Sequence, residues 1–378
     1  MAIFTQNTVA TIATATTANP GGGQSVCKLT DTLMVYLFLK TNDGNKQYAV
    51  IGTVATDGSV SFGTPAKVSD STTNNLSVCR MDDTHFIVGF ANSVSPYDGR
   101  VICGSVSGTD ITFGSAAVYF DAQPYPSVPA VASLSSSVFV VTGLMNDETR
   151  NRYGVIVGTL SGTTITITKN SQTYYGRDNT TASDSPSICG VDSTHFVVSY
   201  RTGDNTSEDG HYLKAASISG TTITFGTQVS VTSGWANNYS NIISLDSTHI
   251  LTASSDILAC ASLSGTDLTV GTNKDFSTGS VISGKLCKID DTHFGILSYS
   301  NQITNFRPLI NKGFVTGTTI TISASDNEQV VADNANVNGL TLGISTRMIL
   351  YWNNGGTTRS VDWAGTVVAQ AGFLFNMV

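Results

Sequence analysis

Histidine beside aspartate, serine or threonine is a combination that acid–base and nucleophilic catalysis use, and four of the five histidines of this chain have such neighbours. His85, His195, His249 and His293 each end the phrase Asp-Asp/Ser-Thr-His and open an apolar run. Catalysis needs one distinct histidine, whereas these four occupy equivalent positions. We therefore expect each imidazole to bond within its turn or to a neighbouring repeat, and the Asp of the phrase to fix the turn. His211 lies outside the phrase, and we expect it to be solvated in a loop.

Six cysteines could supply metal ligands or disulfides, but the same repeat accounts for all of them. Four lie five residues before the threonine position of the phrase, and two share another repeat position; they are Cys27, Cys79, Cys189 and Cys287, then Cys103 and Cys260. Equivalent positions of different repeats are too far apart for most pairs to bond. No Cys-x-x-Cys or His-x-x-His spacing occurs. We predict free, buried packing residues and no metal site.

The phrase recurs at positions 32, 84, 137, 194, 248, 292 and 346, at intervals of 52, 53, 57, 54, 44 and 54 residues. A second phrase follows it: an apolar strand, a Ser-Gly-Thr turn in which glycine supplies positive φ, and a short alternating strand. Each unit therefore predicts four strands, which in the second unit are Leu76 to Met81, His85 to Ala91, Arg100 to Val106 and Asp110 to Val118. Seven such units predict an all-β fold: a single seven-bladed β-propeller over residues 1–378, with four antiparallel strands per blade.

Closure of such a ring requires a strand from one end of the chain. The segment 1–23 contains a lone strand pattern over residues 3–13, and residues 359–378 supply the third strand of the last blade. We expect the N- and C-terminal segments to pair and so to remove a free sheet edge. Which of them supplies the closing strand stays open, because Trp363 to Val378 departs from the repeat.

Composition narrows the class of protein. Only 12% of the residues are charged and only three are glutamate, which disfavours helices nearly everywhere. The net charge of −8, without a basic cluster, argues against nucleic-acid binding. No stretch of about 18 apolar residues predicts a membrane span, and residues 1–23 lack the features of a secretory signal. A composition rich in Thr, Ser, Gly and Asn is typical of extracellular proteins. We therefore expect a protein that is made in a cytoplasm and exposed outside the cell on release.

Linear enzyme motifs are missing from the chain. GxSxG, HExxH, P-loop and EF-hand patterns do not occur. The sialidase-type box, Trp-Asp dipeptides and kelch di-glycines are also missing from the expected places. We predict a protein that is not an enzyme and that binds no cofactor. A glycan-cleaving enzyme remains an alternative, because carboxylates can meet across a propeller face without any linear motif.

The two faces of the predicted propeller differ. One face carries nearly uniform turns, whereas the connections on the other vary in length and hold most of the charge. Aromatic rings beside Asn, Asp and Arg on the variable face suit sugar stacking or a protein interface, although some rings can pack under their own loops. We predict a binding surface that comprises Tyr97, Asp98, Arg100, Tyr125, Arg150, Tyr174, Tyr175, Asp204, Trp235, Tyr239, Arg307 and Trp352.

The runs Asp-Ser-Thr-His-Phe-Val-Val-Ser-Tyr at 192–200 and Ser-Gly-Thr-Thr-Ile-Thr-Phe-Gly at 219–226 resemble the repeats of β-propeller proteins of tailed bacteriophages. The resemblance covers nearly the whole chain and implies a virion structural protein, tail- or capsid-associated and in some members host-attaching. It implies no catalytic residue.

We therefore expect a non-enzymatic virion component. Its partners would be other virion proteins, a host-surface glycan or a receptor, and we expect no binding to nucleic acid. Assembly of the chain into a homo-oligomer is an open alternative. The alternatives are a lectin-like carbohydrate-binding propeller and a glycan-cleaving enzyme. The aromatic loops differ between repeats, which favours one composite site or a protein interface over seven equal sugar sites.

Overall fold

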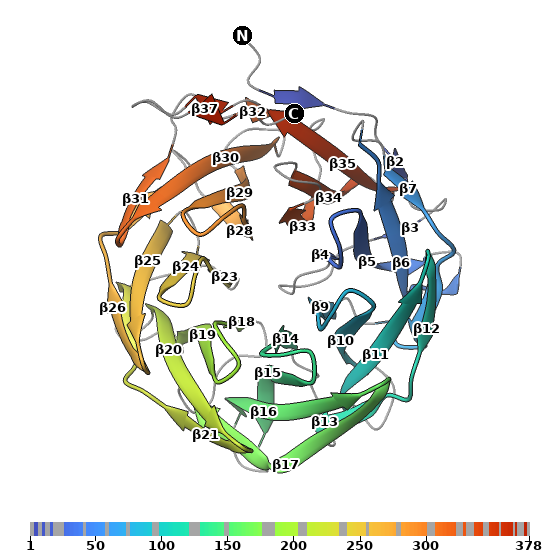
Figure 1. Ribbon diagram of the computed structural model, residues 1–378, viewed down its shortest axis with the longest axis horizontal. Helices are drawn as coiled ribbons and strands as arrows, with labels where there is room; N and C mark the ends of the chain where they lie inside the picture. Colours follow the sequence, from blue (N-terminus) through green and yellow to red (C-terminus); the bar gives the residue numbers. More distant parts are fainter. Residues whose placement is uncertain are drawn as a thin grey trace.

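In the computed structural model, seven antiparallel sheets surround a central axis as blades 1 to 7 (Figure 1). The structure describes residues 4–6, 10–11, 16–17, 26–40, 43–56, 60–72, 76–92, 98–120, 129–146, 151–175, 186–202, 210–233, 240–254, 257–276, 281–300, 307–322, 328–329, 336–342, 348–354, 357–365, 367–368 and 374–375. Within these ranges, no helix is long and apolar enough to cross a membrane. The predicted seven-bladed β-propeller is confirmed.

Each blade is a meander that runs from the centre of the ring outward (Figure 1). Blades 1 to 3 comprise β4 (Val26–Lys28), β5 (Leu33–Lys40), β6 (Lys46–Val54), β7 (Val60–Phe62) and β8 (Ala66–Ser69); β9 (Leu76–Arg80), β10 (His85–Ala91), β11 (Gly99–Ser107), β12 (Asp110–Phe113) and β13 (Ala117–Phe120); and β14 (Ala130–Ser133), β15 (Val138–Asn146), β16 (Asn151–Ser161) and β17 (Thr164–Tyr175). Blades 4 and 5 comprise β18 (Ser187–Gly190), β19 (His195–Thr202), β20 (Gly210–Ser219), β21 (Thr222–Phe225) and β22 (Val229–Ser233); and β23 (Ser240–Ser244), β24 (His249–Ser254), β25 (Ile257–Ser264), β26 (Asp267–Val270) and β27 (Lys274–Asp275).

Blade 6 has the same order, and blade 7 takes its outermost strands from the other end of the chain. The strands are β28 (Val281–Lys288), β29 (His293–Ser300), β30 (Arg307–Thr316), β31 (Thr319–Ile322) and β32 (Glu328–Gln329), then β33 (Asn336–Leu342), β34 (Met348–Asn354) and β35 (Thr357–Gly365) with β1 (Phe4–Gln6) and β2 (Ala10–Thr11). Outside this pattern, β3 (Thr16–Thr17) pairs with β5, and β36 (Val367–Val368) pairs with β37 (Leu374–Phe375).

The N-terminal segment closes the ring. Phe4 lies opposite Gly365 and Ala10 lies opposite Ser360, both in antiparallel register with β35. Strand β33 of blade 7 contacts β4 of blade 1, so the first and last blades are neighbours. The predicted pairing of the two terminal segments is confirmed, and the N-terminal one supplies the closing strands.

The fourth strand differs from its prediction. A single strand was expected from Asp110 to Val118, but β12 and β13 are separate and both pair with β11. Gly114 lies in the gap, where a Cβ atom would overlap the carbonyl oxygen of Thr163 in the Ser-Gly-Thr turn of blade 3. The same approach recurs at Gly63, where a Cβ atom would lie 2.6 Å from the carbonyl oxygen of Thr109. The glycine that ends the second phrase of one blade therefore meets the Ser-Gly-Thr turn of the next blade across the seam.

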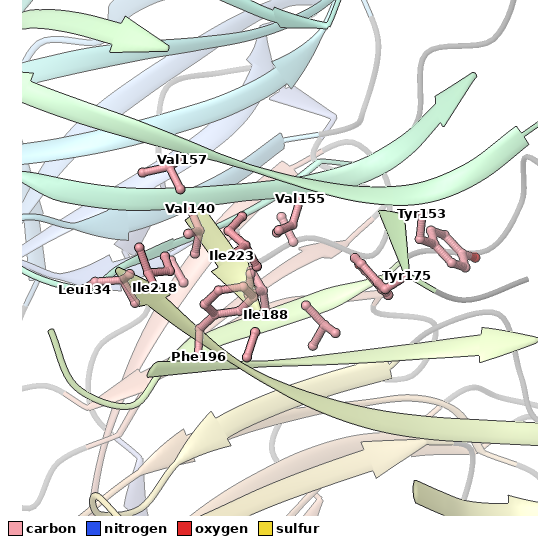
Figure 2. Packing of buried hydrophobic residues seen from close by; sticks show 14 of the residues in the cluster. Leu134, Val140, Tyr153, Val155, Val157, Tyr175, Ile188, Phe196, Ile218 and Ile223 are labelled. Carbon is pink, nitrogen blue, oxygen red and sulfur yellow. The ribbon is translucent and has the colours of Figure 1, made fainter. Parts of the chain in front are cut away.

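The core is divided among these seams. Figure 2 shows the seam between blades 3 and 4, where Val140 and Val155 of blade 3 face Phe196 and Ile218 of blade 4. Alternation along each strand sends every second side chain into one seam and the others into the next. Each fully buried Val, Ile or Phe contributes about 1.5–3 kcal/mol, so a blade depends on its neighbours for stability.

The Asp-Thr-His phrases form the turns between the first and second strands. In blade 2, Asp82 Oδ1 accepts the backbone N–H groups of Thr84 at 2.7 Å and His85 at 2.8 Å, and His85 Nδ1 lies 3.0 Å from the same carboxylate. The arrangement recurs around Asp192, Asp246 and Asp290. Burial alone raises the pKa of Asp82, but its hydrogen bonds outweigh burial and lower it. The turn role predicted for the four histidines is confirmed.

The cysteines are packing residues. All six are free, and Cys103, Cys189, Cys260 and Cys287 are buried while Cys27 and Cys79 are half-buried. Burial raises the pKa of Cys189 to about 12. A thiol held in its protonated form is a poor nucleophile, which agrees with the predicted packing role.

Candidate functional site

Each strand joins a turn face to a loop face. The turn face carries the Asp-Thr-His turns and the Ser-Gly-Thr turns, which backbone bonds tie together, as from Val106 N–H to the carbonyl of Thr84 at 2.8 Å. The loop face carries the connections between the second and third strands and those that lead to the next blade. The sequence varies on the loop face, and rigid scaffolds carry their binding sites on such variable loops.

A cavity of about 320 Å³ opens on the loop face in the seam between blades 1 and 2. Its volume lies near the lower end of the range for small-molecule sites, about 300–1,000 Å³. Blade 1 contributes Val68, Ser69, Asp70 and Ser71, and blade 2 contributes Phe90, Asn92, Arg100 and Ala116. The wall thus combines apolar side chains with carboxylate, hydroxyl, amide and guanidinium groups.

Arg100 is fixed in this wall by a buried carboxylate. Its Nε donates to Asp98 Oδ1 at 2.9 Å and its Nη2 donates to Asp98 Oδ2 at 2.8 Å. The carbonyl of Asp98 accepts the N–H of Asn92 at 2.8 Å, which holds the two sides of the β10–β11 connection together. Hydrogen bonding to Asp98 raises the pKa of Arg100. Such a two-point pair fixes the plane of the guanidinium group.

A cluster of charged side chains lies on blade 1 beside the cavity. Lys46 Nζ donates to the carbonyl of Asp70 at 2.8 Å, and Lys67 Nζ donates to the Asp70 carboxylate at 3.2 Å. Lys67 also pairs with Asp43 at 3.0 Å, and Tyr48 Oη donates to Asp43 at 2.7 Å. The bonds from Tyr48 and then Lys67 lower the pKa of Asp43, and the bond from Lys67 lowers that of Asp70. Both carboxylates are therefore ionised near neutral pH.

The structure brings two of the predicted binding residues together, Asp98 and Arg100. Arg100 lines the cavity with its side chain 34% exposed. Asp98 was predicted to contact a ligand, but its side chain is only 4% exposed and is engaged by Arg100. Its role is to position the guanidinium group, because a buried carboxylate needs a paired cation.

The prediction for Tyr174 and Tyr175 as loop residues is wrong. Strand β17 continues through both, because the fourth strand of blade 3 has no glycine break. Tyr175 is 2% exposed, stacks on Tyr153 with ring centroids 5.9 Å apart, and bonds to Thr142 (Figure 2). Tyr174 is half-buried, and the guanidinium carbon of Arg152 lies 5.7 Å from its ring centroid. Tyr175 is thus a core residue.

Other predicted binding residues lie outside the described part of the chain, namely Tyr97, Tyr125, Arg150, Asp204, Trp235 and Tyr239. Arg307 and Trp352 belong to strands β30 and β34, and their side chains are likewise outside the described residues. The predicted surface is therefore described only around Asp98, Arg100, Tyr174 and Tyr175.

The prediction of a solvated His211 is also wrong. His211 lies in β20, opposite Arg201 in register, because the strands extend into the segment expected to be a loop. It is 1% exposed, and its Nε2 lies 2.6 Å from Ser199 Oγ, which lies 3.3 Å from Thr252 Oγ1 of blade 5. Burial lowers the pKa of His211 to about 3. The residue belongs to a buried polar contact between blades 4 and 5.

Sequence reasoning overlooked the blade 1 residues at the cavity, including Lys46, Lys67 and Asp70. The predicted binding surface rested on long loops with aromatic rings, whereas the connections of blade 1 are short. Five charged residues lie within positions 40–46 and 67–70, in a chain that is only 12% charged. That local density of charge was the available signal.

Among the side chains that the structure describes, no group of three or more His, Cys, Asp or Glu residues is placed to hold a metal ion. The wall of the cavity between blades 1 and 2 offers hydrogen bonds and charge from its side chains. Arg100 and Asp70 line the cavity with Val68 and Phe90, and two lysines contact Asp70 beside it, a combination that suits a small polar ligand.

No protein-family model matches the chain, and no curated relative matches it. Among solved structures, it is similar to a family PL25 polysaccharide lyase, an ulvan lyase, with a TM-score of 0.59 and 10% identity over 94% of this chain and 95% of that one. It is also similar to a proposed 6-phosphogluconolactonase of Bacteroides uniformis, with a TM-score of 0.57 and 12% identity over 92% and 98% of the two chains. At these identities the likeness concerns the fold, which is that of a β-propeller.

Proposed function

We propose that this protein is a non-enzymatic recognition propeller that binds a surface saccharide at its loop face, as a component of a bacteriophage particle. The cavity between blades 1 and 2 carries the proposal, since it combines fixed polar groups with apolar walls. Saccharides present hydroxyl groups around an apolar ring face and suit such a lining. The particle context rests on the resemblance of the runs at 192–200 and 219–226 to phage propeller repeats.

Binding is favoured over cleavage by the state of the carboxylates. Hydrolytic cleavage of a glycoside needs a general acid whose pKa is raised. Hydrogen bonding from Lys67 instead lowers the pKa of Asp70, and Asp98 is held by two bonds from Arg100. The similar polysaccharide lyase was solved bound to -[GlcA(1-4)Rha3S]-, which supports a saccharide as a ligand that this kind of scaffold accommodates.

A glycan array probed with the full chain tests saccharide binding. Ala116→Trp places a large ring at the cavity wall, whereas Ser115→Trp adds the same ring at the adjacent exposed position outside the lining. We expect binding that Ala116→Trp abolishes and Ser115→Trp leaves intact. Absence of any bound glycan, or release of shortened products from a bound glycan, would count against the proposal. Mass spectrometry of purified particles tests the virion part separately.

A further inference from the structure

The cavity between blades 1 and 2 is rich in hydrogen-bond donors that the described residues leave unused. Arg100 has five N–H groups and spends two of them on Asp98. Lys67 spends two of its three on Asp43 and Asp70, and Lys46 spends one of three on the carbonyl of Asp70. Counted against the described residues, three N–H groups on Arg100, two on Lys46 and one on Lys67 are available to a ligand.

The charge around the cavity also differs from that of the whole chain. Arg100 lines the cavity, and Lys46 and Lys67 contact Asp70 of its wall. A fourth cation, Lys40, lies farther out, with its Nζ 4.9 Å from the ring centroid of Tyr48, a ring that Lys67 also contacts. Three carboxylates oppose them, those of Asp43, Asp70 and Asp98. The surroundings of the cavity thus carry a net charge of +1, whereas the chain carries −8. This local excess of positive charge favours a negatively charged ligand at the seam.

The cationic groups are held in place before any ligand arrives. Buried Asp98 fixes the guanidinium plane of Arg100, and Asp70 holds both lysines within 3.6 Å of its oxygens. Fixed donors lose little conformational freedom on binding. Phe90 is 2% exposed and Val68 is 7% exposed, so the base of the cavity is apolar and strengthens charge interactions above it.

The acceptor side of the cavity is small but specific. The Asp70 side chain is 75% exposed, and Oδ1 is the oxygen that both lysines contact. Its other oxygen can accept a hydroxyl proton from a ligand. A bare inorganic anion would satisfy the donors but not this acceptor. A ligand that carries both an acidic group and hydroxyl groups satisfies both.

We infer that the loop-face cavity of blades 1 and 2 binds an acidic saccharide, whose carboxylate or sulfate group is recognised by Arg100 with Lys46 and Lys67. This assignment rests on the proposed saccharide recognition and gives its ligand a chemical class. Carboxylate and sulfate oxygens accept two parallel bonds from a guanidinium group, and the sugar hydroxyls meet Asp70.

The test uses an array of acidic oligosaccharides, each printed beside its carboxyl-reduced or desulfated counterpart. Lys67→Gln removes one cation without disturbing the Asp98–Arg100 pair. Lys288→Gln is the matched control on the turn face, because the two lysine side chains are 41% and 42% exposed and each pairs with an aspartate three residues on. We expect acidic members alone to bind, and Lys67→Gln to raise the Kd about tenfold, as loss of one charged hydrogen bond does. Lys288→Gln should leave the Kd unchanged.

A second variant, Arg100→Lys, keeps the charge but loses the two-point geometry, and it should weaken binding while the thermal midpoint shows that the fold survives. Equal binding of reduced and acidic members would overturn the acidic assignment and leave saccharide recognition standing. If Lys67→Gln and Lys288→Gln changed the binding of acidic members equally, the placement of the binding site in this cavity would be overturned. No bound glycan of either kind would overturn the proposed function itself.

Discussion

His211 makes the seam between blades 4 and 5 sensitive to acid. Its imidazole is 1% exposed, and Nε2 lies 2.6 Å from Ser199 Oγ, within the contact that reaches Thr252 of blade 5. Burial lowers its pKa from the ordinary 6.5 to about 3. Arg201, its register partner on β19, is itself a cation and offers no compensation to an imidazolium. The folded state therefore favours the neutral form of His211.

The magnitude follows from the two pKa values. Below pH 6.5 the unfolded chain binds a proton at His211, whereas the folded protein does so only below about pH 3. Stability therefore falls as the pH drops below 6.5 and levels off below about 3, at about 1.4 kcal/mol for each pH unit between. Near pH 4.5 the loss is about 3 kcal/mol, a large share of a typical folding free energy of about 5–15 kcal/mol.

Chemical denaturation at pH 7 and near pH 4.5 measures this loss. His211→Gln removes the titrating group and keeps an amide for Ser199 Oγ, so it should lose about 3 kcal/mol less than the wild type between the two pH values. Ser199→Ala is the control: it should lower stability at both pH values but keep the pH dependence. The carboxylates of the turns titrate in both proteins and cancel. An identical pH dependence in the wild type and His211→Gln would refute the reasoning.

Three other predictions concern packing and turns. Gly271→Ala places a Cβ 2.5 Å from the carbonyl oxygen of Thr318 and should lower the free energy of unfolding by about 2–3 kcal/mol. Gly265→Ala is the control, because it strains only a positive φ, and it should lower the same quantity by about 1 kcal/mol. Equal losses in the two variants would contradict the seam contact. Asp246→Ala should cost about 1–2 kcal/mol of stability at neutral pH. The pKa of Asp246 is lowered to about 2, so the wild type loses the contribution of this carboxylate as the pH falls below 3.8, and the variant should lack that loss. An unchanged acid profile of the thermal midpoint in the variant would contradict the turn role. Cys189, whose pKa burial raises to about 12, should react with a thiol reagent at pH 8 only after addition of denaturant, and rapid labelling of the native protein would disagree.

Local features of the fold were predictable because they depend on residues close in sequence. The Asp-Thr-His phrase encodes its own hydrogen bonds, since Asp82, Thr84 and His85 lie within four consecutive positions. Glycines such as Gly108 and Gly162 adopt the positive φ that the Ser-Gly-Thr turns require. Repetition of both phrases was therefore enough to predict seven blades and to remove the histidines and cysteines of the repeat from the list of catalytic candidates.

The candidate site was only partly predictable. Arg100 and Asp98 lie two residues apart and were both singled out, but which of them is exposed depends on how blade 2 packs. Lys67 and Asp70 belong to a different blade, 30 or more positions from Arg100 in the chain. No local pattern signals that Asp70 and Arg100 border one cavity, because the cavity exists only where two blades meet.

The sequence by itself determined the repeat, the number of blades and the chemistry of the turns, because short-range hydrogen bonding and strand alternation are written in neighbouring residues. The tertiary structure alone decided which terminus closes the ring, since β1 and β2 find their partner more than 340 residues away on β35. It also decided that Tyr175 and His211 are buried and that Arg100 shares a cavity with Asp70. Burial and close approach across a seam are properties of two blades together, and neither blade's sequence contains them alone.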